Sequence, residues 1–180
     1  MEKEIQRNLI KEKLKSLENK DGLDDKIFEN LVNADFIKGN VLIYNSLKSE
    51  VSTKKIVDYY MGKVNLYMPK VIGDDMVYVK LDKNTVFEVG PFNIKEPIGK
   101  EYLDSDIWFD VCITPLLGYD KALNRLGKGK GYYDRFFSKQ KNCLKVGLAY
   151  TCQEVDKIQA KEFDVKLDYI VNEFGVITCE

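Results

Sequence analysis

The chain has 180 residues, of which 44% are hydrophobic and 12% aromatic, and 28 Lys/Arg against 29 Asp/Glu give a formal net charge of −1. This length and composition predict one globular domain over residues 1–180 with a sizeable core, and the near-neutral charge argues against nucleic-acid or anionic-membrane partners. No apolar run approaches the roughly 18 to 20 residues needed to cross a bilayer, and the absence of histidine excludes Ser-His-Asp and Cys-His nucleophilic schemes and most zinc sites.

Hydrophobic periodicity predicts helices and strands in alternation along the chain. In chain order, the first half contains a helix at 2–19, a break at Asp21-Gly22, a helix at 24–37, a strand at 41–44, a helix from Ser52 or Thr53 to Tyr60, a strand at 64–68 closed by Pro69, and a strand at 76–81 with 85–89 as its candidate partner. The second half contains an ordered loop at 90–100, a strand at 107–114, a helix that starts near Tyr132, a strand at 144–150, a short helix at 155–160, and strands at 169–171 and 176–178. This alternation predicts an α/β fold, a three-layer sandwich with a largely parallel, mixed sheet and helices on both faces.

Two further features bear on location. The N-terminal sequence MEKEIQRNLIKEKLK has no signal-peptide apolar core. The four cysteines are scattered and form no CxxC pair, which favours reduced thiols over disulfides or a metal site. We therefore expect a cytoplasmic protein, and we expect it to act as a monomer.

The segment at 124–137, NRLGKGKGYYDRFF, carries the strongest functional signal in the chain. Its glycines at 127, 129 and 131 ease positive φ angles, so that backbone amides can converge as an anion-binding nest. The helix expected to follow adds free amides and a favourable dipole. Eight Lys/Arg but one acid, Asp134, lie between Lys121 and Lys145. Together these features indicate a site for the phosphates of a nucleotide.

Neither common phosphate motif is present in this segment. A Walker A loop needs a G-x-x-x-x-G-K-Ser/Thr spacing that does not occur, and the dinucleotide motif would need glycine at Tyr132. Alternatives are a flexible surface turn, a non-catalytic RNA-binding segment at 121–145, or a phosphate-ester enzyme such as a phosphosugar isomerase. For Asp134, one role is to stabilise the helix dipole, and the other is to hold Mg²⁺ beside a phosphate.

The same segment, with TPLLGYD at 114–120 before it, resembles the signature of the 5-formyltetrahydrofolate cyclo-ligases, also called methenyltetrahydrofolate synthetases. Smaller similarities extend over nearly the whole chain, at Lys3 and Arg7, in the sequence NSLKSEVST at 45–53, and in the C-terminal DVKLDYIV at 164–171. Two positions depart from the family pattern: Leu116 stands where a glycine is frequent, and Phe163 stands where a histidine is frequent.

The resemblance implies roles that composition and spacing do not give. Lys3 and Arg7 would reach the ATP phosphates, and Arg7 also the folate. The nucleotide would be wrapped by Arg125, Leu126, Gly127, Lys128, Gly129, Lys130, Gly131, Tyr132 and Tyr133, of which Lys128, Gly129, Lys130, Gly131 and Tyr132 are shared with the folate. Asn45 and Glu50 would face the pterin, and Asp134 and Asp164 would hold Mg²⁺. Catalysis would fall to Arg125, Lys128, Lys130 and Tyr132.

The implied reaction is the ATP- and Mg²⁺-dependent closure of 5-formyltetrahydrofolate to 5,10-methenyltetrahydrofolate, with release of ADP and phosphate. The formyl oxygen would be phosphorylated, N10 would attack the activated carbon, and phosphate would leave. Such chemistry depends on alignment and charge neutralisation. It needs no histidine base, which agrees with the composition.

Overall fold

The structure is a computed structural model that describes residues 2–179. Its α-helices are α1 (Lys3–Lys15), α2 (Lys20–Ala34), α3 (Lys54–Tyr60) and α4 (Tyr132–Lys139), and two short 3₁₀ turns are η1 (Pro91–Asn93) and η2 (Thr151–Gln153). The strands are β1 (Asn40–Ile43), β2 (Asn65–Ile72), β3 (Asp75–Lys80), β4 (Val86–Val89), β5 (Lys95–Ile98), β6 (Glu101–Tyr102), β7 (Val111–Thr114), β8 (Gly118–Tyr119), β9 (Arg125–Leu126), β10 (Leu144–Leu148), β11 (Tyr169–Asn172) and β12 (Gly175–Ile177).

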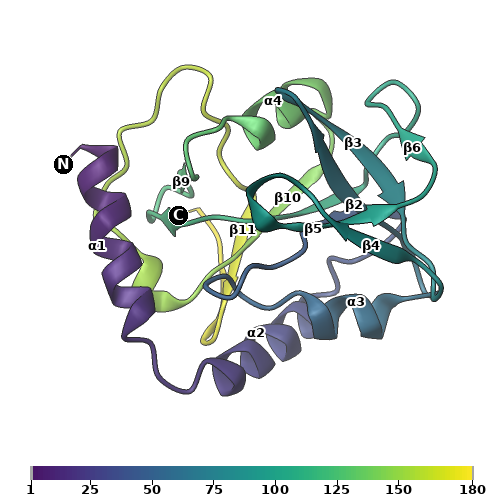
Figure 1. The fold of residues 1–180 in the computed structure, drawn as a ribbon. Coiled ribbons are helices and arrows are strands. Elements are labelled where there is room, and N and C mark those ends of the chain that lie inside the picture. The colour runs from purple at the N-terminus through teal and green to yellow at the C-terminus, as the bar shows by residue number, and fades with distance from the viewer. Residues whose placement is uncertain (1, 180) are drawn as a thin grey trace.

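Eight of these strands form one central sheet, in the order β12-β11-β10-β7-β1-β2-β3-β6 (Figure 1). The five inner strands from β11 to β2 are all parallel, whereas β12, β3 and β6 join the two sides antiparallel to their neighbours. The predicted mixed, largely parallel sheet is therefore confirmed. Two small hairpins, β4-β5 and β8-β9, lie outside the main sheet.

Helices cover both faces of the sheet, because successive residues of its buried strands point to opposite sides. On β1, Val41 and Ile43 pack in one core cluster with Ile27 of α2 and Ile56 of α3. Leu42 points the other way, into a cluster that includes Phe136 and Phe137 of α4. Figure 1 shows α2 and α3 below the sheet and α4 above it. The three-layer α/β architecture is as predicted.

The break between the first two helices falls earlier than predicted. Asn19 has a left-handed backbone with φ 50°, and α2 starts directly after it. Asp21 and Gly22 therefore lie in the first turn of α2 rather than between two helices. The helix tolerates glycine there, and a Cβ on Gly22 would approach the Asn19 side chain to 2.6 Å.

The strand prediction was wrong in two places where prolines or glycines were expected to end a strand. Pro69 lies inside β2 rather than at its end, because β1 pairs with β2 only as far as Tyr67 and a proline beyond that point removes no bond to β1. The segment at 90–100, expected to be a loop, contains η1 and β5. As a result β4 pairs with β5, not with β3 as expected.

Two other elements also differ from expectation. No helix forms at 155–160, because the amides there are used elsewhere: Val155 N–H donates to the Tyr119 carbonyl at 2.8 Å, and Ile158 N–H donates to Asp120 at 2.9 Å. The strand expected at 107–114 is shortened to β7, since the Phe109 amide donates to the Gln140 side chain at 3.2 Å instead of to a strand.

Candidate functional site

The candidate site lies at the carboxyl edge of the parallel sheet. The chain leaves the carboxyl end of β1 through the segment at 44–53, which carries Glu50, and leaves β7 toward the glycine segment at 127–131. The strands β1, β7 and β10 are parallel neighbours, so these connections start from the same edge. This edge is where open α/β sheets bind ligands.

Two of the three glycines in the segment have the left-handed backbone that the sequence suggests, and Gly127 does not. Gly129 and Gly131 have φ of +94° and +71°, a conformation that disfavours a side chain, and Gly131 is the residue before the first turn of α4. Phe136 and Phe137 anchor that helix, each 2% exposed. From α1, Arg7 reaches the segment and donates from Nε to the Gly127 carbonyl at 3.0 Å. The loop is therefore anchored from two directions.

The glycine segment and the segment at 44–53 meet through one ion pair. Lys128 Nζ lies 2.6 Å from Glu50 Oε1, and Glu50 Oε2 accepts the Leu47 amide at 2.7 Å. The Glu50 side chain is 11% exposed, whereas that of Lys128 is 49% exposed. The carboxylate is thus fixed by its own loop, and the lysine is the partner with freedom to move.

A second group of charges lies beside α4. Arg125, whose side chain is 7% exposed, donates to Asp134 Oδ1 at 2.9 Å, and Lys3 pairs with Asp164. The Val165 amide also donates to Asp134 Oδ1, at 3.2 Å, so the Asp134 carboxylate lies against the backbone next to Asp164. The buried Arg125 Nε has no hydrogen-bond partner within the described chain, which leaves the guanidinium with a spare donor.

The charges in this group act on one another. Burial alone would raise the pKa of the Asp164 carboxyl, but hydrogen bonds from the Lys161 amide and from Lys3, with the charges of Lys3 and Arg125, outweigh it and hold that pKa below its usual value. Burial raises the pKa of the Tyr133 hydroxyl well above its usual value, with a further contribution from the charge of Glu50. The Asp164 carboxyl is therefore ionised and the Tyr133 hydroxyl is neutral at ordinary pH.

The donor set suits Mg²⁺ only in the presence of a further ligand. Asp134 and Asp164 supply hard oxygen atoms, but each is neutralised by a cation of the chain. Among residues 2–179 there is no group of three or more His, Cys, Asp or Glu side chains that could hold a metal by itself. Mg²⁺ commonly takes one or two carboxylates and completes its shell with phosphate and water. These two carboxylates fit that arrangement.

Other predicted residues occupy different surroundings. The Leu126 side chain is 1% exposed and packs with Ile10 of α1, so its side chain belongs to the core. Tyr132 donates its hydroxyl to the Gly73 carbonyl at 3.0 Å, and Asn45 donates to the Lys95 carbonyl at 3.0 Å. Lys130 is exposed on the glycine segment.

Three residues near the site were not predicted from the sequence. Arg135 donates twice to the Asp74 carbonyl, at 2.6 and 3.1 Å, and ties α4 to the β2-β3 turn. Asp24 and Tyr150 bond to each other beneath Glu50. No local pattern in the sequence marks these contacts, because their partners lie 61 and 126 residues apart along the chain.

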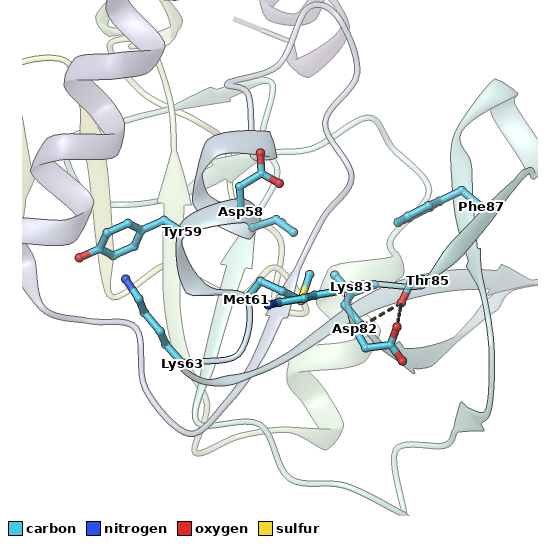
Figure 2. A pocket seen from close by; sticks show the side chains of 10 residues that line it. Asp58, Tyr59, Met61, Lys63, Asp82, Lys83, Thr85 and Phe87 are labelled. Atoms are coloured by element: carbon cyan, nitrogen blue, oxygen red, sulfur yellow. Dashed lines mark hydrogen bonds between the residues drawn. The ribbon is translucent and has the colours of Figure 1, made fainter.

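A cleft of about 730 Å³ lies elsewhere, beside the C-terminal part of α3 and the β3-β4 connection (Figure 2). Its lining residues are Val57, Asp58, Tyr59, Met61, Lys63, Leu81, Asp82, Lys83, Thr85 and Phe87. Asp58 pairs with Lys54, and Asp82 accepts bonds within its own turn, so acids and lysines balance there. None of the predicted site residues lines it.

The fold and the edge site together define an α/β protein in which a loop of glycines and lysines faces a fixed carboxylate. Comparisons with known proteins narrow this class. The model of the 5-formyltetrahydrofolate cyclo-ligase family matches residues 2–173. The chain therefore belongs to the 5-formyltetrahydrofolate cyclo-ligase family, and it is a ligase, as the sequence resemblance predicted.

Individual relatives agree with the family match. The chain is 32% identical to the 5-formyltetrahydrofolate cyclo-ligase of Mycoplasma pneumoniae, over 96% of this chain and 99% of that protein. It is also 32% identical to that of Haemophilus influenzae, over 71% and 72% of the two chains. Among solved structures, the 5,10-methenyltetrahydrofolate synthetase of Aquifex aeolicus matches with a TM-score of 0.85 and 29% identity, over 100% of this chain and 94% of that one.

Proposed function

We propose that the chain converts 5-formyltetrahydrofolate to 5,10-methenyltetrahydrofolate, with consumption of ATP, a requirement for Mg²⁺, and release of ADP and phosphate. The observation that carries the proposal is the 2.6 Å contact between Lys128 and Glu50. This contact joins the loop proposed to bind anions to a fixed carboxylate. The loop would serve the phosphoryl donor, and the carboxylate would serve the reduced pterin.

The glycine segment is proposed to hold the triphosphate. Its left-handed glycines would let backbone amides turn toward a phosphate, and Lys128 and Lys130 add positive charge on the same exposed stretch. Arg7 lies against Gly127 and Arg125 lies behind the loop. These groups would align the γ-phosphate and neutralise its charge, which is the main protein contribution to phosphoryl transfer.

Glu50 is proposed to orient the folate. A carboxylate accepts hydrogen bonds from the N–H groups of a reduced pterin, and Glu50 is already held in place by the Leu47 amide. With the pterin fixed, the formyl oxygen attacks the γ-phosphorus and ADP leaves. N10 then attacks the activated carbon, and the departing phosphate carries away the former formyl oxygen and can accept the N10 proton. No histidine base is needed.

Asp134 and Asp164 are the residues proposed to hold Mg²⁺. When bound, the ion supplies charge neutralisation to the phosphates. The carboxylates would exchange their present partners, Arg125 and Lys3, for the ion, and the two freed cations would then face the nucleotide.

We also propose that the chain works in the cytoplasm and as a monomer. The four cysteines are free thiols, and within residues 2–179 no helix is both long and apolar enough to cross a membrane. Every residue assigned to the site belongs to one chain, so a partner subunit is not required to complete it.

The direct test is the absorbance of the methenyl product during incubation with 5-formyltetrahydrofolate, ATP and Mg²⁺. We expect the band to grow only when all three are present, and to stop growing when the metal is chelated and resume when Mg²⁺ is restored. If no ATP-dependent product forms at high enzyme concentration, the proposed reaction is wrong. If product forms equally well in chelator, the role given to Mg²⁺ is wrong.

A further inference from the structure

A largely buried hydrogen-bond network lies beneath the segment that carries Glu50. Asp24, on α2, has a side chain only 11% exposed, and its Oδ1 accepts the Tyr150 hydroxyl and the Ser52 amide, the latter at 3.2 Å. Its Oδ2 pairs with Lys20 at 2.7 Å. The Tyr150 oxygen, on a fully buried ring, also lies 3.4 Å from the Glu50 carbonyl oxygen. Three separate parts of the chain therefore meet below Glu50.

The ends of the same segment are fixed by a second set of bonds. Thr53 and Ser46 bond reciprocally, each side-chain oxygen accepting the other residue's amide, at 3.3 and 3.1 Å. Thr53 Oγ1 also donates to the Tyr44 carbonyl at 2.8 Å, and the Tyr44 hydroxyl donates to the Val51 carbonyl at 3.0 Å. The ends are thus closed on each other, and Asp24 with Tyr150 supports the middle, where Glu50 lies.

The support of this segment uses two polar groups, the Asp24 carboxylate and the Tyr150 hydroxyl, that packing alone would not need. A buried carboxylate and a buried tyrosine hydroxyl are costly unless hydrogen-bonded, and simple packing would be served as well by apolar residues. Both groups bond to the backbone of 50–52: Asp24 accepts the Ser52 amide, and Tyr150 donates to the Glu50 carbonyl. Their bonds fix where the Glu50 carboxylate stands relative to Lys128, since Glu50 rises directly from the supported backbone.

We propose that Asp24 and Tyr150 are positioning residues for folate recognition. They set the position and orientation of the Glu50 carboxylate that the pterin requires. The inference rests on the proposed role of Glu50. It predicts an effect on folate affinity with little effect on nucleotide affinity, because within residues 2–179 the side-chain hydrogen bonds and ion pairs of Asp24 and Tyr150 reach Lys20, Glu50 and Ser52 and not the glycine segment.

The test measures dissociation constants for 5-formyltetrahydrofolate and for a non-hydrolysable ATP analogue by calorimetry. Tyr150→Phe removes only the hydroxyl. Loss of one buried hydrogen bond that holds a recognition group should weaken folate binding about fivefold to tenfold. ATP-analogue binding should stay within about twofold of the wild type. Asp24→Ala should behave like Tyr150→Phe, whereas Asp24→Asn, which keeps an acceptor oxygen for Tyr150 and Ser52, should restore most of the folate affinity.

Tyr78→Phe is the matched control. Tyr78 is also a buried tyrosine whose hydroxyl donates to an aspartate, Asp104, but it lies in the core cluster on the α4 side. It should lower the melting temperature much as Tyr150→Phe does and leave both affinities unchanged. Unaltered folate affinity in folded Tyr150→Phe, or equal losses for folate and nucleotide, would overturn the inference.

Amide hydrogen exchange separates this inference from the proposed function. Tyr150→Phe should speed exchange at Leu47 and Glu50, whose amides are bonded within the segment, and Tyr78→Phe should not. If the wild-type protein binds no folate, the proposed function fails whatever the exchange shows. If folate binds but exchange at these amides is unchanged in Tyr150→Phe, the positioning role fails alone.

Discussion

Glu50 and Lys128 neutralise each other in the structure, although each is proposed to serve a different ligand. A nucleotide phosphate that recruits Lys128 must draw it away from Glu50, and a pterin that recruits Glu50 must do the same from the other side. The Lys128–Glu50 ion pair therefore has to be separated only once, by the first ligand that binds, and it is already open when the second ligand binds. Whichever ligand arrives first should make binding of the second easier.

Glu50→Gln tests this exchange. Glutamine retains an oxygen that can accept the Leu47 amide, but it removes the charge that holds Lys128. Partly exposed ion pairs contribute about 0.2 to 1 kcal/mol, so the ATP analogue should bind the free variant roughly two- to fivefold more tightly. Folate should bind at least tenfold more weakly, because a charged acceptor is lost. Calorimetric titration of each ligand checks both; parallel losses for the two ligands would contradict the assignment.

At this scale the sequence alone was informative only where a residue type signals its own role. Gly129 and Gly131 were predictable from their spacing, because a positive φ favours glycine. Lys3, Arg7, Glu50 and Asp164 carry no such local signal, and only the family resemblance marked them. Asp24 and Tyr150 were missed altogether, since their contact joins α2 to the end of β10 and depends on tertiary packing.

The element that carries the proposed nucleotide site is α4 together with the loop before it. Arg135 reaches from the first turns of α4 to the Asp74 carbonyl. Tyr132, whose ring centroid lies 5.1 Å from the Arg135 guanidinium, donates its hydroxyl to the Gly73 carbonyl. The guanidinium occupies the space over Gly131, where an added Cβ would lie 2.7 Å from Arg135 Nη1. Gly131 thus permits both the left-handed turn and the cross-link to the β2-β3 turn.

Gly131→Ala should therefore disturb the loop far more than the fold. A left-handed alanine costs about 1 to 2 kcal/mol, and Arg135 must also move from its carbonyl partner. We expect at least tenfold weaker ATP-analogue binding and a melting temperature lower by a few degrees. Gly127→Ala is the matched control, because φ is not positive there and the nearest atom is the end of Arg125 at 3.1 Å. Equal effects of the two substitutions would show that the left-handed turn is not what matters.

Elements were predictable where one signal dominates. The parallel strands and α4 follow from apolar runs and an amphipathic pattern with two buried phenylalanines. The β4-β5 hairpin was missed because its second strand contains Pro97, which is tolerated only where the partner does not need that amide. The segment at 155–160 was given a helix because its pattern carried no sign that Asp120 and Tyr119 would bind its amides.

Across the whole molecule, the order of strands could not be deduced from the sequence, because neighbours such as β1 and β7 are about 70 residues apart and their register is set by packing. The shared edge is a feature that the sequence could have indicated: parallel strands end together, so the segments that follow them share one side. That rule is enough to place Glu50 and the glycine segment on the same rim, although not in contact.

The whole molecule should lose stability in alkali, because its core contains many buried tyrosines. Burial raises the pKa of Tyr119 from the usual 10.0 to about 12, and it also raises the pKa values of Tyr44, Tyr78 and Tyr150. Above pH 10 the unfolded chain releases these protons while the folded chain keeps them, so the unfolded state binds fewer protons and the free energy of unfolding falls as pH rises.

Guanidinium unfolding between pH 8 and pH 12 measures this dependence. Each buried tyrosine contributes nothing to the slope below about pH 9 and up to about 1.4 kcal/mol per pH unit between its unfolded and folded pKa values. Tyr119→Phe removes one such group and its long bond with Asn172. It should make the slope of the free energy of unfolding against pH less steep between pH 10 and pH 12, and leave the slope near pH 8 unchanged. A curve of the same slope in the variant would show that the Tyr119 hydroxyl ionises as readily in the folded chain as in the unfolded one.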